Sequence, residues 1–221
     1  MIWISLYAIL QLFIYFLVDH IRLEWLVAAE SMYWAALLLH LRKKKLLIEY
    51  GMCLPVFCEL YSAVILLAIP AINCVSYGVQ TALAEEMILI LLTSLAEEMA
   101  FRVLLPKLLS EKMHCSVKKS IIISSIAFGL FHGVNLLSGA AGPDVLIQML
   151  YAFCAGLTFC AMVQKTKSVL PSVILHALIN WTAGSQIVGA AIILQTLAFS
   201  ALFAGYAIII FHNTQKGSTY L

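Results

Sequence analysis

Residues 187–211 read IVGAAIILQTLAFSALFAGYAIIIF, and this stretch contains no charged side chain. An α-helix rises about 1.5 Å per residue, so roughly 20 apolar residues cross the hydrocarbon core of a bilayer, which is about 30 Å thick. A chain in lipid must also satisfy its backbone N–H and C=O groups internally, which an α-helix does. The stretch therefore predicts a membrane-spanning helix.

The rest of the chain has the same character. Of its 221 residues, 63% are hydrophobic and 11% are charged, whereas soluble domains carry roughly 25% charged residues. We therefore expect an all-α fold, a polytopic membrane helix bundle of about eight transmembrane helices that forms a single integral membrane domain over residues 1–221. The other apolar stretches that predict spans lie near residues 2–18, 25–41, 52–73, 81–106, 120–137, 145–163 and 169–184.

Basic residues between the predicted spans indicate the orientation. Eleven Lys and Arg residues, Lys216 in the tail included, fall on one side of the membrane, and only Arg22 falls on the other. Cytoplasmic loops carry the excess of Lys and Arg, so we expect both termini in the cytoplasm. The small size and the absence of a targeting extension favour a prokaryotic plasma membrane. The lipid bilayer is an expected partner, the net charge of +2 indicates no nucleic-acid partner, and the sequence predicts no oligomeric state.

Three predicted spans carry polar groups inside apolar sequence. The first reads SLAEEMAFRVLLP at residues 94–106, the second IAFGLFHGVN at residues 126–135, and the third PSVILHALINW at residues 171–181. An ionisable group within a span costs roughly 2.5–3.5 kcal/mol, which makes each one a functional candidate. Counted from the cytoplasmic ends of the spans at 1.5 Å per residue, these groups lie about 10–19 Å deep, which favours one shared site.

Helical spacing separates two roles in the first of these spans. Glu98 and Arg102 stand four residues apart with the acid first, the arrangement that favours an ion pair. Glu97 is turned by about 100° from Glu98 and has no basic residue at that spacing, so it is the better candidate for chemistry. In the third span, His176 and Asn180 share one helix face, and both can donate hydrogen bonds.

A carboxylate near imidazoles and an amide suits the hydrolysis of an amide bond. The carboxylate can deprotonate a water molecule, and a histidine can orient that water or protonate the leaving amine. An amide and an imidazole N–H can stabilise the oxyanion that forms on the carbonyl oxygen. No Ser or Cys stands out as a nucleophile beside these groups, so we expect water to attack the substrate directly.

Three motifs follow one another along the chain: EExxxR at Glu97–Arg102, FxxxH at Phe128–His132 and HxxxN at His176–Asn180. Together they resemble the CAAX protease and bacteriocin-processing family of intramembrane endopeptidases. They lie within roughly residues 94–181, and the family-like catalytic core is expected at about residues 81–211. The part of the chain before the first motif resembles the family only in being hydrophobic helices.

The resemblance implies a core of eight helices around a cavity that opens to the membrane and the cytoplasm. It implies that Glu97 and His132 activate the water and that His176 and Asn180 form the oxyanion site. Val103 departs from the family, which often has Gly after the Arg; this change alters local packing and removes no catalytic group. The residues expected to support the site are Glu98, Arg102 and Phe128.

The resemblance also implies a glutamate peptidase that works without a cofactor. Glu97, His132 and His176 could in principle form a zinc site with two His ligands and one Glu ligand. The sequence lacks the HExxH motif that usually supplies two such ligands from one helix, so zinc is disfavoured. The expected substrate is a membrane-associated peptide or protein, and we favour an unmodified peptide over a prenylated one.

Other functions fit parts of the pattern. A non-catalytic membrane protein that binds a partner, such as a bacteriocin-immunity protein, could use Glu98 and Arg102 as a structural ion pair and the histidines as interhelical hydrogen bonds. A transporter could use the same groups as a proton relay, although the sequence has no clear inverted repeat. A second AEEM string holds Glu85 and Glu86 without a following Arg, and we interpret these as acids that favour a helix N-terminus.

Overall fold

The computed structural model describes residues 23–78, 81, 84–137, 139–183 and 190–216. Every regular element within these segments is a helix, which confirms the predicted all-α class. The predicted span at residues 2–18 lies outside the described residues. The elements are α2 (Leu23–Lys43), the 3₁₀-helix η1 (Phe57–Leu67), α3 (Ala68–Tyr77), α4 (Ala84–Glu98), the π-helix η2 (Met99–Leu104), α5 (Leu105–Met113), α6 (Val117–Phe131), the 3₁₀-helix η3 (His132–Leu136), α7 (Gly142–Thr166), α8 (Leu170–Thr182) and α9 (Ala190–Lys216).

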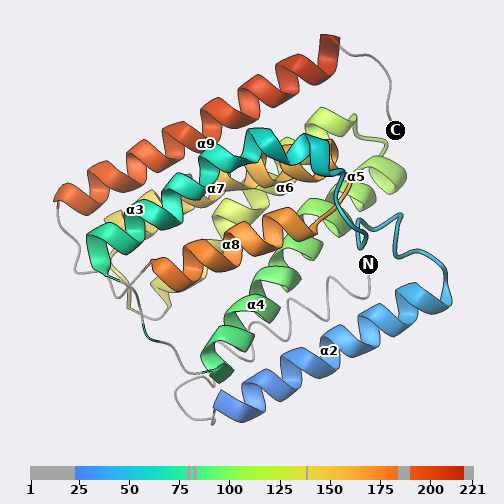
Figure 1. Cartoon of the computed structure of the whole chain (residues 1–221), viewed down its shortest axis with the longest axis horizontal. Coiled ribbons are helices and arrows are strands. Elements are labelled where there is room, and N and C mark those ends of the chain that lie inside the picture. Colours follow the sequence, from blue (N-terminus) through green and yellow to red (C-terminus); the bar gives the residue numbers. More distant parts are fainter. Residues whose placement is uncertain (1–22, 79–80, 82–83, 138, 184–189, 217–221) are drawn as a thin grey trace.

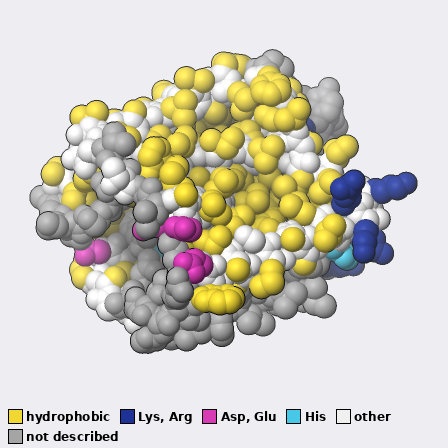
Figure 2. Space-filling view, turned by 60° about the horizontal axis from the view of Figure 1, so that its bottom comes forward, with side chains coloured by type: hydrophobic (Ala, Val, Ile, Leu, Met, Phe, Trp, Pro, Cys, Tyr) yellow, Lys and Arg dark blue, Asp and Glu magenta, His cyan; other side chains and the backbone are white. Residues whose placement is uncertain are grey.

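Several of these helices have the length and character of membrane spans. Large apolar side chains point outward, and Figure 2 shows a face covered by hydrophobic side chains, with Lys and Arg gathered at one end. Soluble monomers rarely expose such continuous apolar surface. The chain is therefore a multi-pass membrane protein, and the number of about eight spans stays a prediction. The described helices long and apolar enough to cross a membrane are Glu59–Tyr77, Val117–Leu136, Gly142–Thr166 and Ala191–His212, and Leu170–Thr182 is a shorter apolar helix.

Helix α8 lies where the two hydrophobic clusters of the bundle meet. Figure 1 shows α9 on one side of the bundle and α2 on the opposite side, with α4 and α8 between them. One cluster packs around Phe159 and Phe203, and the other packs around Trp34 and Met99. Helix α8 contributes buried side chains to both clusters. The packing on its two sides therefore fixes the position of His176, which lies midway along α8.

A π-helical turn precedes Pro106, and the helix continues past this proline, whereas the predicted span ended at residue 106. The N–H of Leu105 bonds to the carbonyl oxygen of Ala100, five residues back. The next bond of this kind would need an N–H on Pro106, and proline has none. The hydroxyl of Ser124, on α6, donates to the carbonyl oxygen of Phe101 instead. The hydroxyl thus satisfies the carbonyl that the proline leaves without its partner.

The third predicted span begins later than the sequence suggested, at Phe57 instead of residue 52. Pro55 has no N–H for a helical hydrogen bond and disfavours the helical conformation in the residue before it, and η1 begins only after it. The connection that precedes η1 is bound to the turn between α7 and α8, because the N–H of Val169 donates to the carbonyl oxygen of Gly51 at 3.0 Å. This bond anchors the beginning of α8.

Helices α6 and α7 pack closely at Gly129, which leads to a first prediction. A Cβ atom on Gly129 would lie 2.8 Å from the carbonyl oxygen of Met149 and 3.2 Å from Cβ of Phe153, so Gly129→Ala pushes the two helices apart. We expect this variant to lower the free energy of unfolding by about 1–3 kcal/mol, measured by thermal unfolding in detergent. Gly205→Ala on α9 is the matched control, since no described atom outside the neighbouring turns of α9 lies within 4 Å of the added Cβ. Equal stability of the two variants would contradict the prediction.

Candidate active site

Glu98 is the anchor of the site. Its carboxylate is fully buried and accepts two hydrogen bonds from Arg102, at 3.1 Å from Nε and 3.0 Å from Nη2. The predicted ion pair at this spacing is therefore present. The same carboxylate lies 3.0 Å from Nδ1 of His176 on α8. Because a carboxylate held by Arg is ionised, Nδ1 of His176 carries a proton and donates it to this bond.

Arg102 is closed off by aromatic rings. Its guanidinium carbon lies 4.0 Å from the centre of the Phe128 ring and 5.5 Å from that of Phe159. Both arrangements are cation–π contacts, and both rings are buried. Phe128 also packs edge-on against His132 and His176, with ring centres 4.9 Å and 6.0 Å apart. The phenylalanine of the FxxxH motif therefore contacts the arginine of the charged pair as well as both histidines.

His132 lies at the junction between α6 and η3. Its Nδ1 is 2.9 Å from the carbonyl oxygen of Phe128, one turn earlier. A carbonyl oxygen only accepts hydrogen bonds, so Nδ1 must be the donor and carry a proton. The imidazole is then left with Nε2 as an acceptor, and His132 lines a cavity. The local backbone thus sets the tautomer of this ring.

Glu97 and Glu98 contact opposite nitrogens of one imidazole. The carboxylate of Glu97 lies 3.6 Å from Nε2 of His176, while Glu98 holds Nδ1. Glu97 also interacts electrostatically with His132. Its side chain is 13% exposed, whereas that of Glu98 is completely covered. Of the two adjacent acids, only Glu97 is therefore open to a small molecule such as water.

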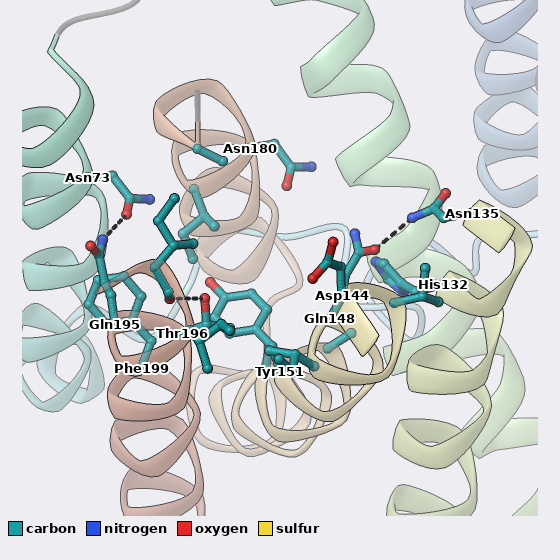
Figure 3. A pocket seen from close by; sticks show the side chains of 18 of the residues that line it. Asn73, His132, Asn135, Asp144, Gln148, Tyr151, Asn180, Gln195, Thr196 and Phe199 are labelled. Carbon is teal, nitrogen blue, oxygen red and sulfur yellow. Dashed lines mark hydrogen bonds between the residues drawn. The ribbon is translucent and has the colours of Figure 1, made fainter. Parts of the chain in front are cut away.

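A cavity of about 450 Å³ lies beside these groups. Its wall includes His132, His176 and Asn180, so three of the four predicted catalytic residues share one cavity. Glu97 does not line this cavity, and its carboxylate contacts His176, which does. Asn180 is exposed, and Figure 3 shows it apart from His132 on another side of the pocket. The structure thus places Glu97 beside His176, and it places Asn180 in the wall of the cavity that His132 and His176 also line.

The chain matches the model of a protein family over residues 67–182, which is just over half of its length. That family is described as type II CAAX prenyl endopeptidase, Rce1-like.

The chain belongs to the Rce1-like CAAX prenyl endopeptidase family.

The matched segment of this Rce1-like chain contains all three motifs, and the resemblance to CAAX proteases is confirmed. No curated protein and no solved structure matches the chain. The family assignment therefore rests on the matched segment, which begins at the end of η1 and ends with α8.

The Rce1-like site contains residues that the sequence analysis did not predict. Phe159 packs against His176 at 5.7 Å between ring centres, and it lies in an ordinary apolar run that gives no signal. Asn73 is buried in α3 and donates to Thr182 at 3.3 Å, while Gln195 on α9 donates to Asn73 at 3.0 Å. A lone Asn within an apolar helix is itself unusual in lipid, so Asn73 carried a signal. These amides form the side of the cavity opposite His132 (Figure 3).

The zinc alternative has a geometric requirement that can be examined. Within the described segments, no group of three His, Cys, Asp or Glu side chains is arranged to hold a metal ion. Glu97 lies 3.6 Å from Nε2 of His176, while Glu98, on the other side of that ring, is held by Arg102. Work without a metal therefore stays a prediction, and the reaction proposed for this Rce1-like chain uses protein groups and water.

Proposed function

We propose that this chain is an intramembrane endopeptidase that hydrolyses a peptide bond in a membrane-associated peptide or protein. The observation that carries the proposal is the placement of His176 between the carboxylates of Glu97 and Glu98, on the wall of a cavity shared with His132. A purely structural ion pair needs only Glu98 and Arg102. Such a role does not explain why a second, partly exposed carboxylate, that of Glu97, lies beside the imidazole of His176.

In the proposed reaction, water lies between the carboxylate of Glu97 and Nε2 of His132. One water proton passes to Glu97 as the water oxygen attacks the carbonyl carbon of the substrate. His132 orients the water through its free acceptor nitrogen. The proton then goes from Glu97 to the leaving amine as the carbon–nitrogen bond breaks. The products are a new carboxyl terminus and a new amine.

His176 and Asn180 would stabilise the oxyanion in this scheme. Glu98 fixes the proton on Nδ1 of His176 and the direction of the ring. Nε2 of His176 faces Glu97. Because Nδ1 is already protonated, the scheme uses His176 as an imidazolium, whose Nε2–H donates to the carboxylate at rest and to the oxyanion during the reaction. The amide of Asn180 would supply a second donor from the same face of α8. Arg102 keeps Glu98 ionised throughout.

The proposal includes the arrangement of the chain in the membrane. We propose about eight transmembrane helices in one domain, with both termini in the cytoplasm of a prokaryotic cell. The support is the loop distribution of Lys and Arg, together with the basic end of the apolar surface in Figure 2.

Product analysis tests the proposed activity. The purified full chain, reconstituted in liposomes, is incubated with membrane-associated peptides in farnesylated and unmodified forms, and the products are identified by mass spectrometry. We expect cleavage at one internal peptide bond, with an unmodified peptide accepted. A protein that binds these peptides but cleaves none of them would instead be a non-catalytic binding protein.

Metal removal is a separate prediction. Because the proposed mechanism uses only protein groups and water, cleavage should continue at an unchanged rate after exhaustive treatment with EDTA and 1,10-phenanthroline. Elemental analysis of the active preparation should find far less than one metal ion per chain. A loss of activity that added Zn²⁺ restores would show that the metal-free mechanism is wrong.

A further inference from the structure

The cavity beside the two histidines has an uneven charge. Asp144 is the one carboxylate in its wall, and no Lys or Arg lines it among the described residues. The guanidinium of Arg102 is bound to Glu98 and covered by two phenylalanine rings. The remaining polar groups of the wall are neutral amides and hydroxyls, besides the imidazoles. Apart from the imidazoles, a ligand in this cavity therefore meets one carboxylate and no Lys or Arg among the described residues.

Asp144 is placed to act on such a ligand. It is the third residue of α7, it is partly buried, and its carboxylate makes no hydrogen bond or ion pair with the other described residues. Gln148, one turn further along α7, receives a hydrogen bond from Asn135 of η3 at 2.8 Å. This bond holds the face of α7 that carries Asp144 against the element that begins at His132. Figure 3 shows Asp144, Gln148 and His132 on the same side of the pocket.

The position of Asp144 at a helix start does not account for its place in the cavity. Acids are favoured in the first turn of any helix, and Glu85 occupies that turn in α4. Glu85 is exposed and is not part of the cavity wall, however. Both acids lie in the first turn of a helix, and only Asp144 shares a cavity with the histidines of the site.

We propose that Asp144 is a specificity-determining residue that pairs with a positively charged side chain, Lys or Arg, of the substrate peptide. This inference rests on the proposed function. A cationic side chain gains the unpaired carboxylate as a partner, whereas an acidic side chain or a free C-terminal carboxylate near it meets like charge. The cavity is large enough for a few peptide side chains, so one cationic residue can enter beside the bond that is cleaved.

Substitutions that change the charge of the peptide and of position 144 test this inference. Fluorogenic peptides based on one cleaved sequence carry Lys, norleucine or Glu at each position in turn around the cleaved bond, and kcat/KM is measured in liposomes. We expect the wild type to favour Lys over Glu by about tenfold or more at one position, which corresponds to a typical partly desolvated charge pair. Asp144→Asn should remove this preference, and Asp144→Lys should reverse it.

Glu85→Lys is the matched control, because it makes the same change of charge in the first turn of another helix outside the cavity. It should keep the wild-type preference for Lys. If Asp144→Lys does not fold, Asp144→Asn alone tests the inference, because it replaces one carboxylate oxygen by an amide NH₂ group and keeps the shape of the side chain. The inference is overturned if the wild type has no charge preference at any position, or if the preference survives in Asp144→Asn.

Binding separates this inference from the catalytic proposal. The dissociation constants of fluorescent Lys and Glu peptides are measured with the wild type and with Asp144→Asn, independently of cleavage. A charge preference that depends on Asp144 in a chain that cleaves nothing would support the subsite and contradict the proposed hydrolysis. Cleavage with equal affinity for Lys and Glu peptides would support hydrolysis and overturn the subsite.

Discussion

Replacing Glu97 by Gln should lower kcat for peptide cleavage by about 10³-fold, the range expected for losing a general base. An amide cannot take the proton from the attacking water, so the chemical step loses its acceptor. KM should change little, because Glu97 lies outside the cavity wall and the cavity keeps its shape. The measurement is steady-state cleavage of one peptide by the reconstituted wild type and variant.

The chain supplies its own control for this substitution. The string AEEM occurs twice, so Glu85 stands in the same local sequence as Glu97, but it is exposed and far along α4 from the histidines. Glu85→Gln should leave kcat and KM at wild-type values. Thermal unfolding of Glu97→Gln should also match the wild type, since the side chain is partly open and makes one long contact at 3.6 Å. Full activity in Glu97→Gln would eliminate the proposed mechanism.

Replacing Glu98 by Gln should damage both stability and activity. This substitution leaves the buried guanidinium of Arg102 without a counter-charge, and breaking a buried pair in this way costs about 3–5 kcal/mol. It also weakens the bond that fixes the ring of His176. We expect a large drop in the thermal unfolding temperature in detergent, together with a loss of cleavage of about 10²-fold or more in the fraction that stays folded.

A double variant separates the two effects. Glu98→Gln combined with Arg102→Met removes both charges, and neutral replacements of buried pairs often recover stability. The double variant should therefore unfold closer to the wild-type temperature than Glu98→Gln does. It should stay inactive, because His176 still lacks its ionised partner. If activity returned together with stability, Glu98 would serve only to neutralise Arg102.

The sequence predicted the parts of the site that depend on spacing within one helix. The Glu98–Arg102 pair follows from helical geometry, and the structure contains it. The grouping of Glu97, His132 and His176 needed a further argument, similar depth in the membrane, and the structure brings Glu97 within 3.6 Å of His176. The catalytic roles of these residues stay predictions.

Features that depend on packing between helices were not predictable in this way. Phe159 meets His176 only because α7 crosses α8, and one apolar residue among many carries no mark of such a contact. Asp144 has the sequence signature of an ordinary helix start, and only the cavity gives it a further meaning. The start of the third helix was misplaced because hydrophobicity continues through Pro55 while the helix does not. Hydrophobic periodicity indicates which face of a helix is apolar, but it does not indicate which other helix packs against that face.

Pro106 has a consequence for the alignment of the helices that carry Glu97 and Phe128. Because proline has no N–H, a carbonyl oxygen one turn earlier lacks its backbone donor. Here that oxygen, on Phe101, accepts a hydrogen bond from Ser124 on a different helix. Phe128 follows Ser124 by four residues on the same face of α6, and His132 comes four residues later, where η3 begins. The hydrogen bond from Ser124 therefore replaces the missing backbone bond and links two helices. It limits how far α6 can slide or rotate relative to the helix that carries Glu97.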